Sequence, residues 1–234
     1  MKLAEGLIVS CQALKDEPMY GGSSVPKFAL AAYQAGAQGI RANTVKDINR
    51  IYRIIHGNLP IIGIIKANYP ESKVYITPTL KEVKKLIRAK CDVIALDATF
   101  HPRPKNEKLI DLIRYIRHHS SKLIMADCAT LDEAVNAERL GFDYISTTLR
   151  SYTEETAGIR IPDIANLKKL LTLLPVDKVI FEGGIDSPQT FKKVLDTGVK
   201  RCVIGGAITR PLQITKRYLK EYDQREKGEK NGKQ

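Results

Sequence analysis

Hydrophobic and polar positions alternate in blocks along the whole chain. Short apolar runs rich in β-branched residues, such as PIIGIIK at Pro60–Lys66, are too short for helices and are typical of parallel strands buried on both faces. Longer segments between them have apolar residues at helical spacing. The predicted strands are Gly6–Gln12, Gly39–Asn43, Pro60–Lys66, Asp92–Ala98, Lys122–Asp127, Tyr144–Thr148, Lys178–Gly183 and Cys202–Ala207. The predicted helices are Val25–Gly36, Val45–His56, Thr79–Lys90, Asn106–His119, Leu131–Leu140, Asp163–Leu174, Pro188–Thr197 and Pro211–Tyr222.

Eight such strand–helix units in 234 residues predict an α/β fold, a single-domain (β/α)₈ TIM barrel over residues 1–224. A doubly wound open sheet is the alternative, but it normally uses fewer strands, and no GxGxxG follows the first strand. The segment Arg225–Gln234 has no apolar residue. We expect it to form a disordered polar tail.

The composition favours a soluble protein. Hydrophobic residues make up 43% of the chain, yet no apolar run reaches membrane-spanning length, and the start MKLAEGLIVS lacks a signal peptide's long apolar segment. A cytoplasmic location without membrane association is therefore expected. Cys11, Cys91, Cys128 and Cys202 form no CxxC pair, and most sit in or beside apolar runs, which favours buried free thiols.

The net charge of +12 raises the question of nucleic-acid binding. However, the basic residues are spread over helix-like segments, aromatic residues are only 6%, and no stretch interleaves the two for stacking bases. We therefore predict no nucleic-acid partner. A basic surface also suits an anionic small substrate.

The active site of a TIM barrel lies at the carboxyl ends of its strands. The polar residues at those positions are Gln12, Arg41, Lys66, Asp97, Asp127, Thr148 and Glu182. Lys66 and Glu182 each end an apolar alternation, so both are predicted to point inward, as a candidate base of lowered pKa and a candidate acid. Arg41 would be a cationic clamp and Gln12 an amide contact. The alternatives are a Lys66 that extends to solvent, a Glu182 that pairs an arginine, and structural roles for Asp127 and Asp97.

The last two loops suggest a phosphate site. Gly183–Gly184 follows the seventh strand, and Gly205–Gly206 follows the eighth, with Arg210 just beyond. Glycines let the backbone approach an anion, and these loops are the usual phosphate position in barrels, although ordinary turn glycines remain the alternative. None of the four histidines ends a predicted strand, so no metal site is expected.

Short motifs spread over most of the chain occur in the same order as in a known protein family. They are SCQAL at Ser10–Leu14, GIRAN at Gly39–Asn43, GIIK at Gly63–Lys66, ITPT at Ile76–Thr79, ALDAT at Ala95–Thr99, MADCAT at Met125–Thr130, STTL at Ser146–Leu149 and GGAITRP at Gly205–Pro211. From about Gly6 to Tyr218 the chain resembles the bacterial N-acetylmannosamine-6-phosphate 2-epimerases.

The resemblance implies a TIM barrel that converts N-acetylmannosamine 6-phosphate to N-acetylglucosamine 6-phosphate in sialic-acid and amino-sugar breakdown, without a cofactor. It implies a homodimer, through the last helix. It makes Lys66 and Glu182 the catalytic pair. The residues that would bind the phosphorylated amino sugar are Gln12, Arg41 and Asp127 for the sugar and Gly183, Gly184, Gly205, Gly206 and Arg210 for the phosphate.

Two departures from the family pattern stand out. Relatives often carry Glu-Gly-Arg-Ile at the end of the seventh strand, where this chain has Gly184 in place of the arginine. The segment Met19–Lys27 is rich in glycine and serine, so the first loop is expected to be more mobile.

The mechanism also leaves alternatives open. Two protein groups could carry the C2 proton, or a substrate hydroxyl could relay it. A Schiff-base aldolase that uses Lys66 and a sugar-phosphate sensor without activity are the competing functions.

Overall fold

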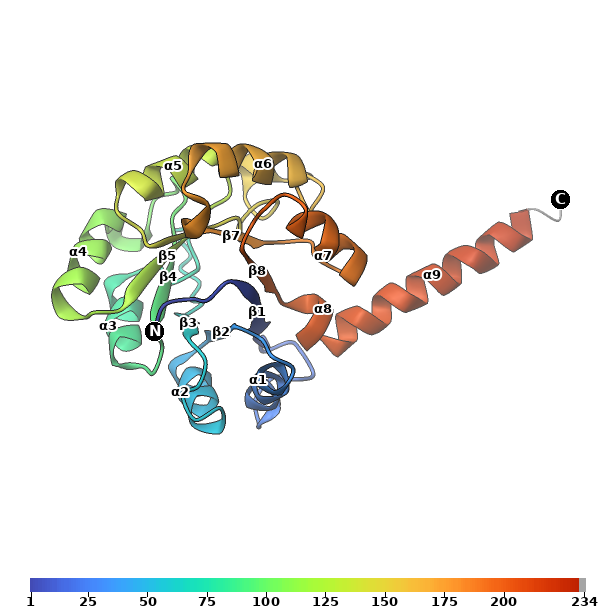
Figure 1. The fold of residues 1–234 in the computed structure, drawn as a ribbon, viewed down its shortest axis with the longest axis horizontal. Helices are drawn as coiled ribbons and strands as arrows, with labels where there is room; N and C mark the ends of the chain where they lie inside the picture. The colour runs from blue at the N-terminus through green and yellow to red at the C-terminus, as the bar shows by residue number, and fades with distance from the viewer. Residues whose placement is uncertain (232–234) are drawn as a thin grey trace.

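The computed structural model describes the chain through Asn231, and this part contains a closed barrel of eight parallel strands surrounded by helices (Figure 1). The strands follow one another around the barrel in chain order, and β8 pairs with β1 to close it. The strands are β1 (Gly6–Cys11), β2 (Gly39–Asn43), β3 (Ile61–Ile64), β4 (Val93–Asp97), β5 (Leu123–Asp127), β6 (Tyr144–Ser146), β7 (Val179–Glu182) and β8 (Arg201–Ile204). The predicted (β/α)₈ barrel is confirmed.

Helices follow each strand and cover the outside of the barrel (Figure 1). They are α1 (Ser24–Gln34), α2 (Val45–Ile54), α3 (Leu80–Arg88), α4 (Leu109–His119), α5 (Leu131–Arg139), α6 (Ile164–Leu173), α7 (Pro188–Leu195), α8 (Gly206–Thr209) and α9 (Pro211–Asn231). Short 3₁₀ turns lie at Pro104–Asn106, Glu154–Thr156 and Val176–Lys178.

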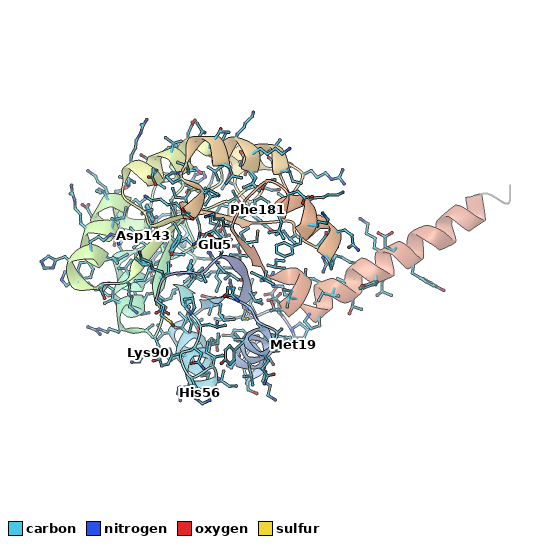
Figure 2. The ribbon with its side chains drawn as sticks, in the orientation of Figure 1. Glu5, Met19, His56, Lys90, Asp143 and Phe181 are labelled. Carbon is cyan, nitrogen blue, oxygen red and sulfur yellow. The ribbon has the colours of Figure 1, made fainter. Side chains whose placement is uncertain are left out.

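The core has two layers because successive strand side chains point to opposite faces. Ile62 and Ile64 lie in a buried cluster inside the barrel, as their spacing predicts, whereas the outward positions pack against the helices. Figure 2 shows the side chains that fill the space between the strands and the helices. Gly63 faces outward at a close approach, where an added Cβ would lie 2.8 Å from the Cys91 sulfur. The interior alternation therefore places Lys66, two residues after Ile64, at the mouth.

Six strands end earlier than predicted, and the early ends of β3 and β6 change the barrel mouth. The chain after β3 folds back on itself, since Lys66 forms an antiparallel bridge with Ile76 and the Thr77 N–H donates to the Ile65 carbonyl at 2.8 Å. β6 ends at Ser146 rather than Thr148. Both changes bring loop residues to the barrel mouth.

Thr79 followed by Glu82 is the sequence pattern of a helix capping box, but the structure forms none there. The Thr79 hydroxyl donates to the Glu82 carboxylate and makes no hydrogen bond to the backbone of α3. A capping box occurs instead at the start of α5, between Thr130 and Glu133.

The last helix differs most from the prediction. It was expected as a barrel helix over Pro211–Tyr222, but α9 is longer and runs away from the barrel (Figure 1). The predicted disordered tail Arg225–Gln234 continues as helix through Asn231, since its Arg, Glu and Lys residues are good helix formers. Residues 232–234 lie outside the described part of the chain.

The structure confirms the expected state of the cysteines, because all four are buried and free of disulfides. Among the helices of the described residues, none combines the length and apolar character needed to cross a membrane.

Candidate active site

A cavity of about 460 Å³ opens at the carboxyl ends of the strands. It brings together most of the residues that the sequence predicts for the site. The predicted residues that line it are Gln12, Arg41, Lys66, Thr148, Glu182, Gly183, Gly184, Gly205, Gly206 and Arg210. Asp97 and Asp127 do not line it.

The floor of the cavity is an ion pair between Arg41 of β2 and Asp127 of β5. The guanidinium donates two parallel hydrogen bonds to the carboxylate, Nη1 to Oδ1 at 3.0 Å and Nη2 to Oδ2 at 2.7 Å. The two side chains are 1% and 0% exposed. Burial opposes the charge of Arg41, but the neighbouring Asp127 and Glu182 outweigh it and raise the pKa of the guanidinium. Asp127, which is predicted to contact the sugar, lies beneath Arg41 with both oxygens engaged in hydrogen bonds.

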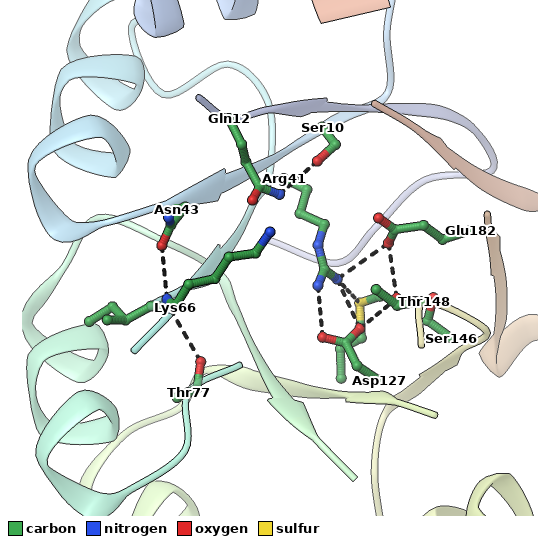
Figure 3. A network of polar contacts seen from close by, with 12 residues as sticks. Ser10, Gln12, Arg41, Asn43, Lys66, Thr77, Asp127, Ser146, Thr148 and Glu182 are labelled. Carbon is green, nitrogen blue, oxygen red and sulfur yellow. Dashed lines mark hydrogen bonds and ion pairs between the residues drawn. The ribbon is translucent and has the colours of Figure 1, made fainter. Parts of the chain in front are cut away.

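Glu182, at the end of β7, lies beside this pair (Figure 3). Its Oε2 is 3.5 Å from Arg41 Nη1 and 3.0 Å from the Thr148 hydroxyl. Burial raises the pKa of Glu182, and Asp127 adds to the rise, against the opposing effects of Arg41, Thr148 and Lys66. A fraction of this carboxyl is therefore protonated at a pH where ordinary glutamates are ionised.

Lys66, two residues after the end of β3, reaches the same space, and its pKa is shifted in the opposite direction. Burial lowers the pKa of Lys66, and the cations Arg41 and Arg210 lower it further, whereas Glu182 and Asp127 raise it. Its Nζ lies 6.0 Å from the centre of the Tyr75 ring. In the view of Figure 3, Lys66 and Glu182 lie on either side of the Arg41 side chain. The arrangement places a candidate base and a candidate acid around one cation.

The other end of the cavity carries Arg210 and the glycine loops. Arg210 Nε forms an ion pair of 3.1 Å with Oε1 of Glu17, whose other oxygen accepts the Leu14 N–H at 2.7 Å. This contact fixes the arginine at the rim. Gly205 and Gly206 lie next to it in the cavity wall.

The glycine at position 184 has a structural reason in this chain. Its φ is +74°, and an added Cβ would lie 2.5 Å from the Ile161 carbonyl carbon. The loop between β6 and α6 therefore occupies the space that a side chain at Gly184 would need. Ile161 itself lines the cavity.

Two buried polar atoms have no hydrogen-bond partner among the described residues, Gln12 Oε1 and Arg41 Nε. Both side chains line the cavity. An unpaired buried polar atom is costly and rare, so one acceptor and one donor at this place indicate a polar ligand.

Further lining residues were not predicted from the sequence. They are Ser10, Tyr75, Ile76, Tyr152, Ile161, Ile185, Asp186, Val203, Ile204, Ala207, Gln213 and Arg217. Tyr75 and Tyr152 come from loops, and Arg217 comes from α9. Periodicity gives no signal for a loop that folds back, although the apolar–aromatic run VYI at Val74–Ile76 inside a polar loop was a clue.

No group of three or more His, Cys, Asp or Glu side chains is placed to hold a metal ion within the part of the chain that the structure describes.

Comparison with known proteins assigns this chain to a family. A family model described as "Putative N-acetylmannosamine-6-phosphate epimerase" matches residues 25–224. The chain belongs to this epimerase family.

Individual relatives of the family agree with this match. A Staphylococcus aureus (strain JH9) protein named "Putative N-acetylmannosamine-6-phosphate 2-epimerase" is 53% identical over 220 residues, which cover 93% of this chain and 97% of that protein. The solved structure of the N-acetylmannosamine-6-phosphate 2-epimerase from Clostridium perfringens is 47% identical, with a TM-score of 0.88 over 93% of this chain and 94% of that one.

A more distant likeness concerns the fold alone. The thiamine phosphate pyrophosphorylase of Pyrococcus furiosus is 16% identical, with a TM-score of 0.59 over 90% of this chain and 89% of that one.

Replacing Asp127 by Asn should destabilise the protein strongly. The substitution keeps the shape but leaves the Arg41 cation buried without its counter-charge, which costs about 3–5 kcal/mol. Urea unfolding of the two proteins measures the difference. Asp111→Asn is the control, because Asp111 and Arg114 form an exposed pair, 61% and 74% accessible, worth less than about 1 kcal/mol. Equal losses in the two variants would contradict a stabilising role for the floor pair.

Proposed function

We propose that this cavity epimerises N-acetylmannosamine 6-phosphate to N-acetylglucosamine 6-phosphate by removing the C2 proton and returning it to the opposite face. The observation that carries the proposal is the pair Lys66 and Glu182, whose pKa values are shifted toward each other within one cavity. Such opposed shifts mark acid and base roles. The 53% identity to a protein named "Putative N-acetylmannosamine-6-phosphate 2-epimerase" supports the same substrate, and a role in amino-sugar and sialic-acid breakdown is consistent with it.

The chemistry requires each of these groups. The C2 proton is acidic only when C1 is a carbonyl, so the sugar ring opens first. The neutral amine of Lys66 then takes the C2 proton, and the bonding electrons move to the C1 oxygen as an enolate. Protonation of C2 from the other face gives the epimer, with Glu182 on that face or on the ring and enolate oxygens. The net reaction consumes no oxidant or reductant.

The rest of the cavity suits the remainder of the substrate. Arg41 Nε and Gln12 Oε1 would donate to and accept from the sugar, since both are buried and lack partners among the described residues. Asp127 would act through Arg41, by holding its guanidinium. Arg210 and the backbone of the glycine pairs would bind the phosphate.

The cellular setting of the reaction is part of the same proposal. A phosphorylated sugar is a metabolite of the cytoplasm, and four free buried thiols suit a reducing compartment. The proposed reaction does not involve nucleic acid.

The test of the catalytic pair is turnover in heavy water. Wild type should place solvent deuterium at C2 of the product, followed by NMR. Lys66→Met removes the amine, and Glu182→Gln removes the charge at constant shape, so each should lose about 10²–10⁴ in kcat while the fold persists. Near-normal turnover by Lys66→Met, or product without deuterium at C2, would exclude this mechanism. Borohydride with substrate should label nothing, because covalent trapping would indicate the aldolase alternative.

Arg210→Ala tests the phosphate site. The fixed clamp binds substrate and transition state alike, so the variant should raise KM by about 10- to 100-fold with little change in kcat. Unphosphorylated N-acetylmannosamine supplies the control, because its weak kcat/KM should not depend on Arg210. An unchanged KM for the 6-phosphate would remove Arg210 from the site.

The same proposal includes a homodimer formed through α9. Large apolar side chains are exposed along this helix, with Leu212, Tyr218, Leu219 and Tyr222 between 44% and 76% accessible. Figure 2 shows the side chains of α9 projecting beyond the barrel, where no other element lies beside them. Leu195 of α7 and Ile208 of α8 add exposed apolar surface near its base. A second copy of the same chain would cover these surfaces.

The mass in solution tests the dimer. Light scattering on a sizing column should give twice the chain mass for wild type and a lower mass for Leu219→Lys, since a charge on the apolar stripe opposes association. Leu173→Lys on α6 is the matched control, because Leu173 is equally exposed at 55% and lies on another face. Monomeric wild type would contradict the proposal.

A further inference from the structure

The motif STTL after β6 has a feature that the proposed function does not use. The β6–β7 ladder pairs only Ile145 with Val179 and Ser146 with Ile180. Because β6 stops at Ser146, the main chain of Glu182 meets no strand residue of β6. Its N–H and C=O would be left unpaired on that side.

The hydroxyl of Thr147 takes the place of the missing strand. It accepts the Glu182 N–H at 3.0 Å and donates to the Glu182 carbonyl oxygen at 2.8 Å. Thr147 is 5% exposed. One side chain therefore satisfies both main-chain groups of the glutamate.

The next residue holds the side chain of the same glutamate. Thr148 Oγ1 lies 2.7 Å from Asp127 Oδ1 and 3.0 Å from Glu182 Oε2, so it bridges the two carboxyl groups. It also lies 2.8 Å from the hydroxyl of Ser146, which is fully buried. Figure 3 shows this cluster beside the Arg41 guanidinium.

Because each hydroxyl has one proton, the donors and acceptors in the hydrogen bonds around Thr148 can be assigned. Thr148 has one proton, and the two carboxyl oxygens are stronger acceptors than a hydroxyl. Thr148 therefore donates toward the carboxyl groups, and Ser146 donates to Thr148. The two carboxyl groups therefore share this one donor.

We propose that Thr147 and Thr148 are positioning residues for Glu182, Thr147 through its main chain and Thr148 through its carboxyl group. The proposal rests on the proposed function, in which Glu182 faces the sugar. Fixing both ends of a catalytic side chain preserves the geometry that proton transfer needs. Among the described residues the two hydroxyls bond only Glu182, Asp127 and Ser146, while the main-chain N–H of Thr147 donates to the Ile180 carbonyl of β7.

Titration of Glu182 itself tests the proposal without relying on activity. The charged groups that face Glu182 are Arg41 from β2, Lys66 from the segment after β3 and Asp127 from β5. Removing the Thr148 hydroxyl takes a donor from the Glu182 carboxylate and from Asp127, and both losses disfavour the ionised glutamate. The pKa of Glu182 should therefore rise in Thr148→Val and return toward the wild-type value in Thr148→Ser.

The measurement is carbon-13 NMR of protein labelled at the glutamate carboxyl carbon, titrated with pH. Glu182→Gln identifies the signal by deleting it. Thr99→Val is the matched control, since Thr99 also donates to a buried carboxylate, Asp97, but lies outside the cavity lining. It should leave the Glu182 titration unchanged.

Kinetics give a second readout. Thr148→Val should lower kcat by about 10- to 100-fold, the loss of one hydrogen bond to a charged group, with little change in KM for the 6-phosphate. The limb of the pH profile that Glu182→Gln abolishes should move to higher pH. Ser146→Ala should shift the titration in the same direction by less, and it serves if Thr148→Val fails to fold.

The outcomes separate the two proposals. A wild type that exchanges no C2 proton would reject the proposed function, while the carboxyl titration would still decide the role of Thr148. If Thr148→Val folds and the pKa of Glu182 is unchanged in it, the positioning role is overturned. If Thr148→Val does not fold, an unchanged pKa of Glu182 in Ser146→Ala overturns it.

Discussion

Burying a guanidinium and a carboxylate inside a barrel costs several kcal/mol per ion unless each satisfies the other. Arg41 and Asp127 meet this condition with two parallel hydrogen bonds, although they come from β2 and β5, which β3 and β4 separate in the barrel. The pair fixes a cation at the centre of the cavity floor, and Glu182 and Thr148 are arranged around it. The positions of the Glu182 and Thr148 side chains are therefore tied to this pair, whereas Arg210 is held separately by Glu17.

The same ion pair acts on the pKa values of the two groups that the proposed reaction needs. Burial is the largest cause of both shifts, lowering the pKa of Lys66 and raising that of Glu182. Arg41 adds to the lowering for Lys66, whereas for Glu182 it opposes the rise more strongly than Asp127 supports it. Burial therefore sets the direction of the Glu182 shift, and the ion pair limits its size.

The sequence predicts those parts of the site that depend on strand periodicity. The alternation that places Ile62 and Ile64 inside the barrel also places Lys66 at its mouth, and the same parity holds for Ile180 and Glu182. Periodicity does not say how deep a residue at a strand end lies, so Asp127 was expected at the sugar although it lies under Arg41. Periodicity also gives no information on a loop that folds back, such as the one that carries Tyr75. Nor does it give the direction of the last helix, whose apolar side chains are exposed in the single chain. The two positioning threonines follow from an early strand end, which propensity does not locate to within two residues.

The contacts at the bottom of the site are stronger than those that hold the outer part of the loop between β6 and α6. The floor pair is buried, whereas the loop between β6 and α6 is held over the rim by Lys73–Glu154 at 2.5 Å and His101–Glu155 at 3.3 Å, with Lys73 and both glutamates more than half exposed. Exposed pairs contribute about 0–1 kcal/mol each, so these two contacts hold the outer part of the loop weakly. Its base is held more firmly, since Arg150 donates to Asp163 and to the Ala129 carbonyl, and the side chains of Arg150 and Asp163 are only 18% and 17% exposed. Movement of the outer part of the loop would thus cost little, while the buried floor beneath Lys66 and Glu182 stays in place.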